Sequence, residues 1–301
     1  MMNNKHVSTP AFNPYIALVS GLIGVSTGAI FARLAGEAPA LVIAAYRLGL
    51  ASLILAPLAW CKCRSEIRGL SGHDLKLALL SGLLLALHFA VWISSLDYTS
   101  VANSVVLVTT NPLWVGLLTP FITQERISRI ALISIIISVI GGIIISAGDF
   151  AASGDALLGD FLALMGGVFM ALYLLMGRKL RGKLSLLAYI TVCYGSAALI
   201  LWVVVLLLRL PVTGFGTETV VCFWAMALIP QLIGHTSYNW SLKWFSTSTV
   251  AVSLLAEPIG STILAYLIFD EGLTWFLVIG SLLIFLAIYL STLSESETIS
   301  T

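Results

Sequence analysis

The chain has 301 residues, of which 59% are hydrophobic and only 10% charged, and its formal net charge is +1. Soluble domains carry about 25% charged residues, so the composition excludes a mainly soluble protein, and the near-zero net charge excludes a basic nucleic-acid-binding face. The segment 133–145 is apolar on every face, unlike the alternating strands of a membrane barrel. The sequence therefore predicts an all-α integral membrane protein whose partner is the lipid bilayer.

Ten apolar segments follow one another, each close to the roughly 20 residues that a helix needs to cross a bilayer. They span residues 14–33, 38–60, 75–96, 100–122, 129–147, 156–177, 185–208, 218–241, 248–269 and 273–292. The first follows a short polar tail and is predicted to be a retained span instead of a cleaved signal peptide. The short connections leave no room for an extramembrane domain.

The basic residues predict the orientation of the spans. With the N-terminus inside the cell, most of the 15 basic residues fall in or beside cytoplasmic loops, whereas Arg33 and Arg209 fall outside and Arg47 lies within a span. The loop that carries Asp149 and Asp155 then lies outside. The positive-inside rule thus predicts a multi-pass protein of the cell (inner) membrane with both termini in the cytoplasm.

An internal repeat occurs at an offset of 146 residues, and it predicts two units, 1–150 and 151–301. The matched pairs include Asn111-Pro112 with Glu257-Pro258, Gln124-Glu125 with Asp270-Glu271, Ser95-Leu96 with Ser241-Leu242, and Gly21 with Gly167. Each unit holds five spans, so the second copy must enter the membrane with the opposite orientation. Inverted repeats of this kind recur in secondary transporters.

Two stretches carry a likeness to a known family. They are span four, from Thr99-Ser100-Val101-Ala102-Asn103 through Asn111-Pro112-Leu113 to Glu125-Arg126, and span nine, from Leu254-Leu255-Ala256-Glu257-Pro258-Ile259 to Asp270-Glu271. Together with Arg47 they resemble the EamA branch of the drug/metabolite transporter superfamily, over essentially the whole chain. The resemblance implies ten helices in two inverted five-helix repeats, a central substrate cavity, and export of amino acids, other metabolites or toxic compounds.

Glu257 is the sharpest candidate for chemistry, because a carboxylate near the middle of a span costs several kcal/mol. A carboxyl group poised between its charged and neutral forms can exchange a proton for substrate. Thr249, Ser253, Glu257 and Ser261 are spaced four apart and predict one polar helix stripe. The alternative is that Glu257 caps backbone groups freed by Pro258, since proline removes a helical hydrogen bond.

Arg47 is the other charge predicted within a span. Its guanidinium could bind a carboxylate or another anion, because it offers a planar fork of donors. The alternative is a structural tie to Tyr46, to a loop carbonyl or to Glu257.

Polar residues on spans three and eight are further cavity candidates. His88 and Trp92 lie one turn apart on span three, and His can relay protons near neutrality. Span eight carries a polar stripe that faces either a cavity or a neighbouring helix. Its members are Gln231, His235 and Asn239, with Tyr238 alongside.

Pro112 and Pro258 predict helix kinks at equivalent places in the two halves, with Asn111 beside the first. Such paired kinks indicate a binding site between the halves. Gly21, Gly24 and Gly28 form a small-residue face on span one, which is typical of close helix packing.

The remaining motifs bear on function class. No nucleotide-binding loop, serine-nucleophile motif or paired-His helix occurs, and the four cysteines lack the spacing of a zinc site, so neither a cofactor nor a metal is expected. The leading hypothesis is a proton- or exchange-coupled exporter of a small metabolite, amino acid or drug-like compound, working by alternating access. The alternatives are an intramembrane enzyme on a lipid-linked substrate, using Glu257, His88 and His235, and a non-transporting sensor or partner subunit.

Overall fold

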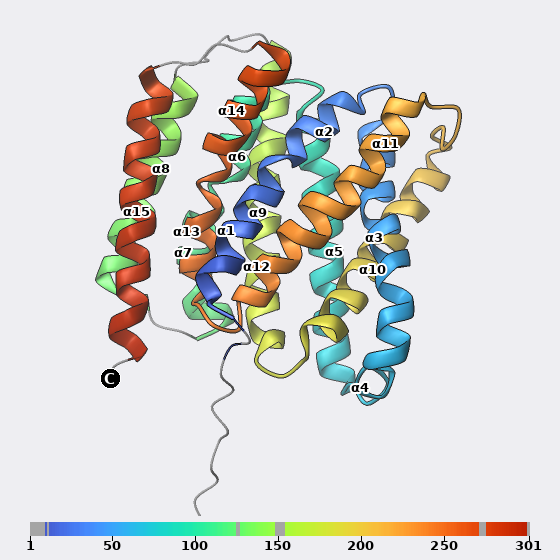
Figure 1. The fold of residues 1–301 in the computed structure, drawn as a ribbon, viewed down its shortest axis with the longest axis horizontal. Helices are drawn as coiled ribbons and strands as arrows, with labels where there is room; N and C mark the ends of the chain where they lie inside the picture. Colours follow the sequence, from blue (N-terminus) through green and yellow to red (C-terminus); the bar gives the residue numbers. More distant parts are fainter. Residues whose placement is uncertain (1–9, 11, 125–126, 148–153, 271–274, 300–301) are drawn as a thin grey trace, which may run out of the picture.

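A computed structural model describes residues 10, 12–124, 127–147, 154–270 and 275–299. This part of the chain contains helices and no strand, and the helices run side by side along one common direction (Figure 1). The helices of the first half are α1 (Pro14–Ser26), α2 (Gly28–Leu34), α3 (Ala40–Lys62), α4 (Arg64–Arg68), α5 (Gly72–Ser95), α6 (Val101–Val108), α7 (Asn111–Ile122) and α8 (Arg129–Ala147). Those of the second half are α9 (Gly154–Arg181), α10 (Leu186–Leu207), α11 (Thr217–Met226), η1 (Ala227–His235), α12 (Thr236–Ser241), α13 (Thr247–Leu254), α14 (Glu257–Phe269) and α15 (Trp275–Ile299).

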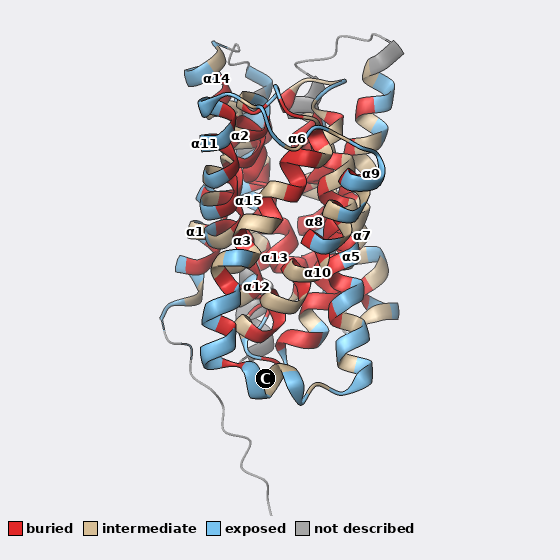
Figure 2. Cartoon of the chain, turned by 90° about the vertical axis from the view of Figure 1, so that its right-hand side faces the viewer, coloured by how far each residue is buried: buried red, intermediate tan, exposed pale blue. Residues whose placement is uncertain are grey.

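Eight helical stretches in the described residues are long and apolar enough to cross a membrane. They are Pro14–Leu34, Ala40–Lys62, Gly72–Ser95, Ser104–Ile122, Ala156–Arg181, Leu186–Leu207, Thr217–Ser241 and Thr247–Phe269. Two shorter apolar helices are Arg129–Ile144 and Val278–Ser291. Large apolar side chains such as Leu53, Phe121 and Trp275 are exposed on the outside of the bundle, while the buried residues gather inside it (Figure 2). Apolar outward faces suit a lipid solvent, and the expectation of an all-helical integral membrane protein is confirmed.

Five helices in the described residues begin at a polar cap, because the first backbone N–H groups of a helix have no partner within the helix. The side chains of Asn13, Ser71, Ser128, Ser185 and Ser246 each accept a hydrogen bond from the first turn that follows, at distances of 3.0 to 3.2 Å. These caps fix where α1, α5, α8, α10 and α13 begin.

The predicted kinks are realised as interruptions of the helix. Between α6 and α7 the amide of Thr110 donates to the carbonyl of Leu107, three residues back, and between α13 and α14 the amide of Ala256 donates to Ser253 in the same way. Pro112 and Pro258 then occupy the first turn of α7 and α14, where a missing N–H costs no helical hydrogen bond. The two interruptions lie 146 residues apart, as the repeat predicts.

The interruption in the ninth segment corrects one expectation. Residues Thr249, Ser253, Glu257 and Ser261 do not form one continuous helical stripe, because α13 ends at Leu254 and α14 begins at Glu257. Ser253 turns its hydroxyl back onto the carbonyl of Val250 at 2.7 Å.

The eighth segment contains a π-helix that the sequence reading did not anticipate. Residues 227–235 form η1, with Pro230 inside it and α-helix on both sides. Because a π-helix is hydrogen-bonded from i to i+5, it takes more residues per turn and changes the face that the following residues occupy relative to an uninterrupted α-helix. The predicted stripe of Gln231, His235 and Asn239 is therefore divided.

The glycine face on α1 packs as expected. A methyl group on Gly24 would lie 2.8 Å from the backbone of Gly234 in η1, so the two backbones are in direct contact. Gly21 faces the ring of Tyr238 in the same way, and Gly28 faces Trp92.

Helices distant in the sequence pair across the bundle. The segment of η1 and α12 packs on α1, α5 packs on α9, and α3 packs on α10. Helices α6 and α7 contact α14 and α13 respectively, and α8 packs along α15 at one side of the bundle (Figure 1).

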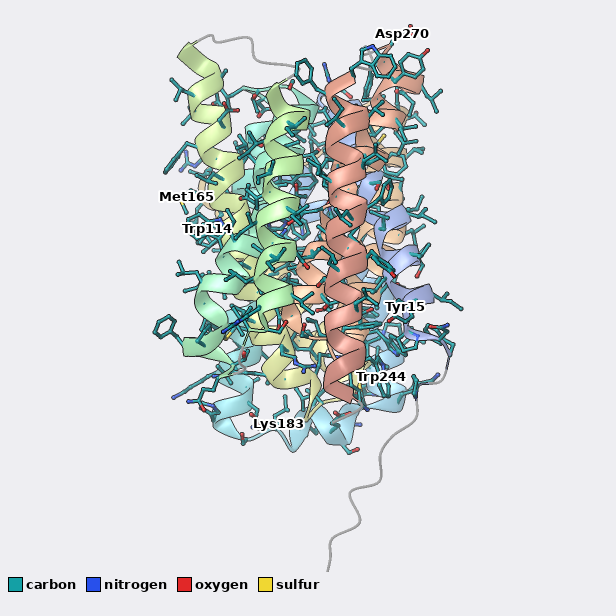
Figure 3. The ribbon with its side chains drawn as sticks, turned by 90° about the vertical axis from the view of Figure 1, so that its left-hand side faces the viewer. Tyr15, Trp114, Met165, Lys183, Trp244 and Asp270 are labelled. Carbon is teal, nitrogen blue, oxygen red and sulfur yellow. The ribbon has the colours of Figure 1, made fainter. Side chains whose placement is uncertain are left out.

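The two ends of the bundle differ in charge. Lys183 lies at one end and Asp270 at the opposite end (Figure 3). Lys183 forms an ion pair with Asp74 at 2.9 Å, at the end where α4 and the turn between α9 and α10 meet. Glu125 and Glu271, the matched acids of the repeat, and Asp149 fall outside the described residues, as does the side chain of Asp155.

Candidate functional site

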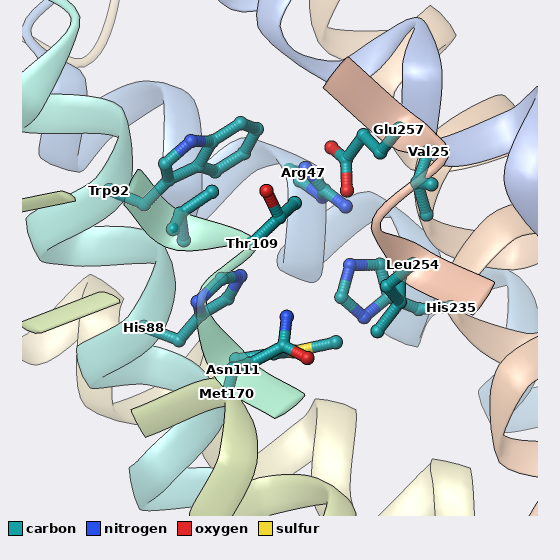
Figure 4. Close-up of a pocket in the computed structure, with 11 residues that line it drawn as sticks. Val25, Arg47, His88, Trp92, Thr109, Asn111, Met170, His235, Leu254 and Glu257 are labelled. Atoms are coloured by element: carbon teal, nitrogen blue, oxygen red, sulfur yellow. The ribbon is translucent and has the colours of Figure 1, made fainter. Parts of the chain in front are cut away.

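A small closed cavity lies in the interior of the bundle, where the interruptions of the fourth and ninth segments meet. Its volume is about 20 Å³, which is room for about one water molecule. The lining residues come from both halves of the chain. They are Val25, Arg47, His88, Trp92, Val108, Thr109, Asn111, Met170, His235, Leu254 and Glu257 (Figure 4).

Arg47 reaches the cavity from α3 and is 1% exposed. Its Nε donates to the side-chain oxygen of Gln231 at 2.8 Å, and its guanidinium carbon lies 3.9 Å from the centre of the Phe89 ring. The cation is thus held by a neutral oxygen and by the negative face of an aromatic ring. Its Nη1 is buried without a hydrogen-bond partner. The structural ties considered from the sequence are replaced by Gln231, because Tyr46 donates instead to the carbonyl of Val212 at 2.6 Å.

Glu257 is the first residue of α14 and lines the same cavity, with 8% of its surface exposed. The close-up shows its carboxylate directed toward the guanidinium of Arg47 (Figure 4). The ion pairs within 4 Å among the described residues do not include Arg47 with Glu257. The proposed capping role is not formed either, since among the described residues the hydrogen bond to Glu257 goes to its backbone carbonyl, from Ser261, and no backbone N–H donates to its carboxylate. The carboxylate therefore faces the cavity and is not bound to the backbone.

His88 and Trp92 present one wall of the cavity from α5, and their rings stack with centres 5.9 Å apart. The Nδ1 of His88 lies 2.9 Å from the carbonyl oxygen of Gly166 and so carries a hydrogen, which leaves Nε2 as the second titratable position. His235, from η1, faces His88 with ring centres 6.1 Å apart. The ring of Phe89 lies next to His88, His235 and Arg47 and holds the three side chains around it.

Asn111 is the first residue of α7 and lines the cavity at the position that the repeat matches to Glu257. Its side-chain oxygen is buried without a partner. One half of the chain thus places a neutral amide where the other places an acid, and both stand at the beginning of a half-helix.

Six of the ten binding or coupling candidates predicted from the sequence line the cavity. These are Arg47, His88, Trp92, Asn111, His235 and Glu257. The other four are placed elsewhere. Gln231 lies behind Arg47, Tyr238 packs on Gly21, and Ser253 bonds to its own helix.

Asn239, in α12, belongs to a buried hydrogen-bond network whose residues do not line the cavity. Its side-chain amide donates to the hydroxyl oxygens of Tyr173, at 2.5 Å, and Tyr194, at 3.0 Å, while Arg181 donates to its backbone carbonyl at 2.9 Å. Because the amide nitrogen is occupied by two tyrosines, Asn239 acts as a helix-to-helix link in this structure.

The sequence reading missed five lining residues. Val108 and Thr109 end the fourth segment's first half, and Leu254 ends α13, so a search of the residues before each predicted kink would have found them. Val25 and Met170 are apolar residues on apolar helices, and the sequence holds no signal that separates them from their neighbours.

Comparison with known proteins agrees with this architecture. A model of the EamA-like transporter family matches residues 13–147 and again residues 157–293. A protein described as an uncharacterized transporter from Clostridium kluyveri is 27% identical over 240 residues, which cover 76% of each chain. Another uncharacterized transporter, from Archaeoglobus fulgidus, is 26% identical over 261 residues, covering 85% of this chain and 88% of that protein.

One solved crystal structure has the same fold, with a TM-score of 0.75 and 17% identity, and the match covers 95% of this chain and 98% of the other. At that identity the likeness concerns the fold alone. The family model, in contrast, accounts for nearly the whole sequence, in two consecutive matches. The chain therefore belongs to the EamA-like transporter family.

Proposed function

We propose that this protein is a secondary transporter that carries a small molecule through the central cavity by alternating access, in the direction of export. The observation that carries the proposal is the cavity itself. Arg47 and Glu257, two oppositely charged residues from different halves, are buried at one small cavity without a direct ion pair. Charged groups inside a membrane protein are costly and mark substrate or ion pathways.

The pairing of the helices supports two inverted repeats, 1–150 and 151–301, of five spans each. A two-fold axis in the membrane plane would exchange α5 packed on α9 with α1 packed on η1 and α12. It would likewise exchange α6 on α14 with α7 on α13, and it would leave the pairs α3–α10 and α8–α15 in place. The two matches of the family model, one in each half, support the same division.

The size of the cavity supports a moving site. About 20 Å³ holds about one water molecule and no metabolite, so substrate must enter a conformation in which the halves have separated at one face. Relative motion of two similar halves around a central site is the usual mechanism of such repeats.

The remaining parts of the proposal are orientation and coupling. The basic residues near α4 and near the end of α9 support a cytoplasmic location of that end, with both termini inside and the protein in the cell (inner) membrane. Glu257 is the proposed coupling group for a proton- or exchange-driven cycle, because it alone among the cavity residues is a carboxylic acid.

Transport in proteoliposomes with an imposed proton gradient tests the proposal. A panel of amino acids, organic acids and organic amines is screened on the wild-type protein, and we expect gradient-dependent accumulation of at least one class. Glu257→Gln keeps the shape of the side chain and removes its titration, so we expect it to lose uphill accumulation of the same compound while still folding.

Glu218→Gln, on the exposed first turn of α11, is the matched control and should transport like the wild type. The proposal fails if no member of the panel is moved by the wild type. The coupling role fails if Glu257→Gln retains gradient-driven accumulation.

A further inference from the structure

The charge balance of the cavity bears on its substrate, an inference that rests on the proposed function. Arg47 remains a cation at every physiological pH, whereas Glu257 is an anion or a neutral acid depending on its proton. In a buried site a net charge is costly, and one anion is enough to neutralise Arg47. Either the carboxylate of Glu257 or a bound anionic substrate can neutralise Arg47.

Buried donors without partners surround Arg47. Arg47 Nη1 and Trp92 Nε1 are buried at the cavity without partners, and so is the side-chain nitrogen of Gln231 directly behind Arg47. Buried donors without partners are costly, and a ligand that accepts hydrogen bonds would remove that cost. The other unpartnered polar atoms of the lining are the side-chain oxygen of Asn111, which is an acceptor, and Nδ1 of His235, which donates or accepts according to its protonation.

Other titratable groups lie near the pair. His88 and His235 border the cavity and, if protonated, would add positive charge and strengthen its attraction for an anion. The hydroxyls of Tyr173 and Tyr194 are engaged with Asn239, and the ring of Tyr173 lies 6.2 Å from that of His235. Tyr238 packs on α1, and its hydroxyl is buried without a hydrogen-bond partner.

The helix ends contribute little to the balance. Helices α7 and α14 begin at the cavity, but α6 and α13 end beside it, so the positive and negative ends of their dipoles largely cancel. The side chains therefore set the sign of the site.

Much of the remaining wall is apolar. Val25, Val108, Met170 and Leu254 surround the charged pair, and Met170 is an unbranched side chain that adapts to different shapes. An anionic head at Arg47 with a small hydrocarbon or aromatic body fits this combination of surfaces.

We propose that the cavity binds a small organic anion of the carboxylate type, held by Arg47, and that each anion is loaded together with one proton on Glu257. The proton binds one carboxylate oxygen of Glu257 and converts it to the neutral acid, which frees Arg47 to take the substrate's negative charge. Substrate and proton therefore cross the membrane together, as an electroneutral pair, and export of this pair is driven by the outward gradient of the substrate. A cationic substrate would do the opposite and displace the proton from Glu257.

The sign of the proton exchange tests this proposal directly. Purified protein in weakly buffered detergent solution is mixed with benzoate, benzamide or benzylamine, which share a ring and differ in charge, while a pH indicator follows protons and thermal stabilisation follows binding. We expect benzoate to bind preferentially and to take up about one proton per anion from solution, since each bound anion requires one neutralised carboxylate. Its affinity should fall about tenfold per pH unit on the alkaline side, where Glu257 has lost its proton.

Four variants assign the groups. Glu257→Gln mimics the neutral acid, so it should bind benzoate without proton uptake and without the alkaline loss of affinity. Arg47→Gln should lose benzoate binding, and Arg47→Lys, which keeps the charge, reports on the site if the glutamine variant fails to fold. Glu218→Gln, on the exposed first turn of α11, should retain both benzoate binding and proton uptake.

Each contrary result overturns the proposal. For binding, the contrary results are preferential binding of benzylamine or benzamide, or no binding of benzoate. For protons, they are proton release on binding, or binding without proton uptake, as a zwitterion-like site would show. For the variant, the contrary result is proton uptake that persists in Glu257→Gln. The proposed function is judged separately: transport of compounds other than anions would preserve it and remove this inference. Anion-linked proton uptake in a protein that transports nothing would preserve this inference about binding and remove the proposed transport function.

Discussion

At the scale of single residues, two arginines at the end of α9 donate to backbone carbonyls. Arg181, which is buried, donates to the carbonyls of Asn239 and Leu184, and Arg178, which is half-buried, donates to those of Leu242 and Phe245. Both lie in the last turn of α9, where Arg181 joins it to α12 and Arg178 joins it to the turn that follows α12, and both interact favourably with carbonyl-rich helix ends. Arg47 differs because it lies within its span and keeps an unpartnered Nη1 at a cavity. Its place within the span and its unpartnered donor distinguish Arg47, a candidate for binding, from the arginines that link helices at the end of α9.

Glu37 gives a residue-scale prediction at the opposite end of the bundle. Its Oε2 accepts from the amide of Gly216 at 2.8 Å and from the hydroxyl of Thr219 at 2.9 Å, and these bonds hold its pKa below the ordinary value. The loop 208–216 that it tethers covers a pocket of about 220 Å³ lined by aromatic residues, including Tyr46. Because the pKa is lowered, the tether is complete above the ordinary glutamate pKa and is lost as the pH falls through the lowered value.

We expect amide hydrogen exchange in the loop 208–216, corrected for the intrinsic pH dependence of exchange, to accelerate as solutions are acidified through that range. Glu37→Ala should show the fast exchange at every pH, since it removes the acceptor. Glu218→Ala on the same exposed surface should exchange like the wild type. An exchange rate in Glu37→Ala equal to the wild type at neutral pH would show that the two hydrogen bonds do not hold the loop.

At the scale of helices, interruptions and small residues have different structural roles. The breaks before α7 and α14 place Asn111 and Glu257 at the cavity, whereas the glycines of α1 bring its backbone against η1. Close backbone approach is a common basis of helix association in membranes, where the hydrophobic effect does not hold helices together. The helix breaks depend on proline, and the close contact between α1 and η1 depends on the missing Cβ of glycine.

Gly24→Ala tests the contact between α1 and η1. The added methyl would stand 2.8 Å from the backbone of Gly234, and a backbone cannot rotate away as a side chain can. We expect a loss of about 1–3 kcal/mol in stability, typical of an overpacked site, seen as a lower thermal unfolding midpoint in detergent.

Gly195→Ala, in the middle of α10, is the matched control because no atom lies within 4 Å of the added methyl. It should leave the midpoint unchanged or raise it slightly, since alanine favours the helix. An equal effect of the two substitutions would mean that helix propensity, and not the contact with Gly234, sets the result.

At the scale of the whole molecule, the distribution of basic residues between the two ends of the bundle predicts its orientation in the membrane. The end that carries α4 and the last turn of α9 is rich in Lys and Arg, and the opposite end carries the loop 208–216. Basic loops are retained on the cytoplasmic side. The native cysteines allow this orientation to be tested, because Cys61 is exposed near the basic end while Cys63, Cys193 and Cys222 are buried.

The three buried cysteines are replaced by alanine, and the single-cysteine protein is treated with a membrane-impermeant maleimide. We expect Cys61 to be labelled only after the cells are permeabilised, because the proposed orientation places its end in the cytoplasm. A second protein, in which Cys61 is also removed and Thr213→Cys is added to the exposed loop 208–216, should be labelled in intact cells. The reverse pattern would contradict the orientation proposed from the basic residues.

The sequence by itself determined the class of fold and the positions of most helices, because apolar length, prolines and caps act locally. It also identified Arg47 and Glu257, since a charged residue within an apolar segment can be recognised from the local sequence alone. Only the tertiary structure decided which polar residues share the cavity. The π-helix rotates His235 and Asn239 to different surroundings, and Gln231 and Phe89 take the role of partners for Arg47. These relations join residues that are far apart in the chain, so periodicity along one helix could not reveal them.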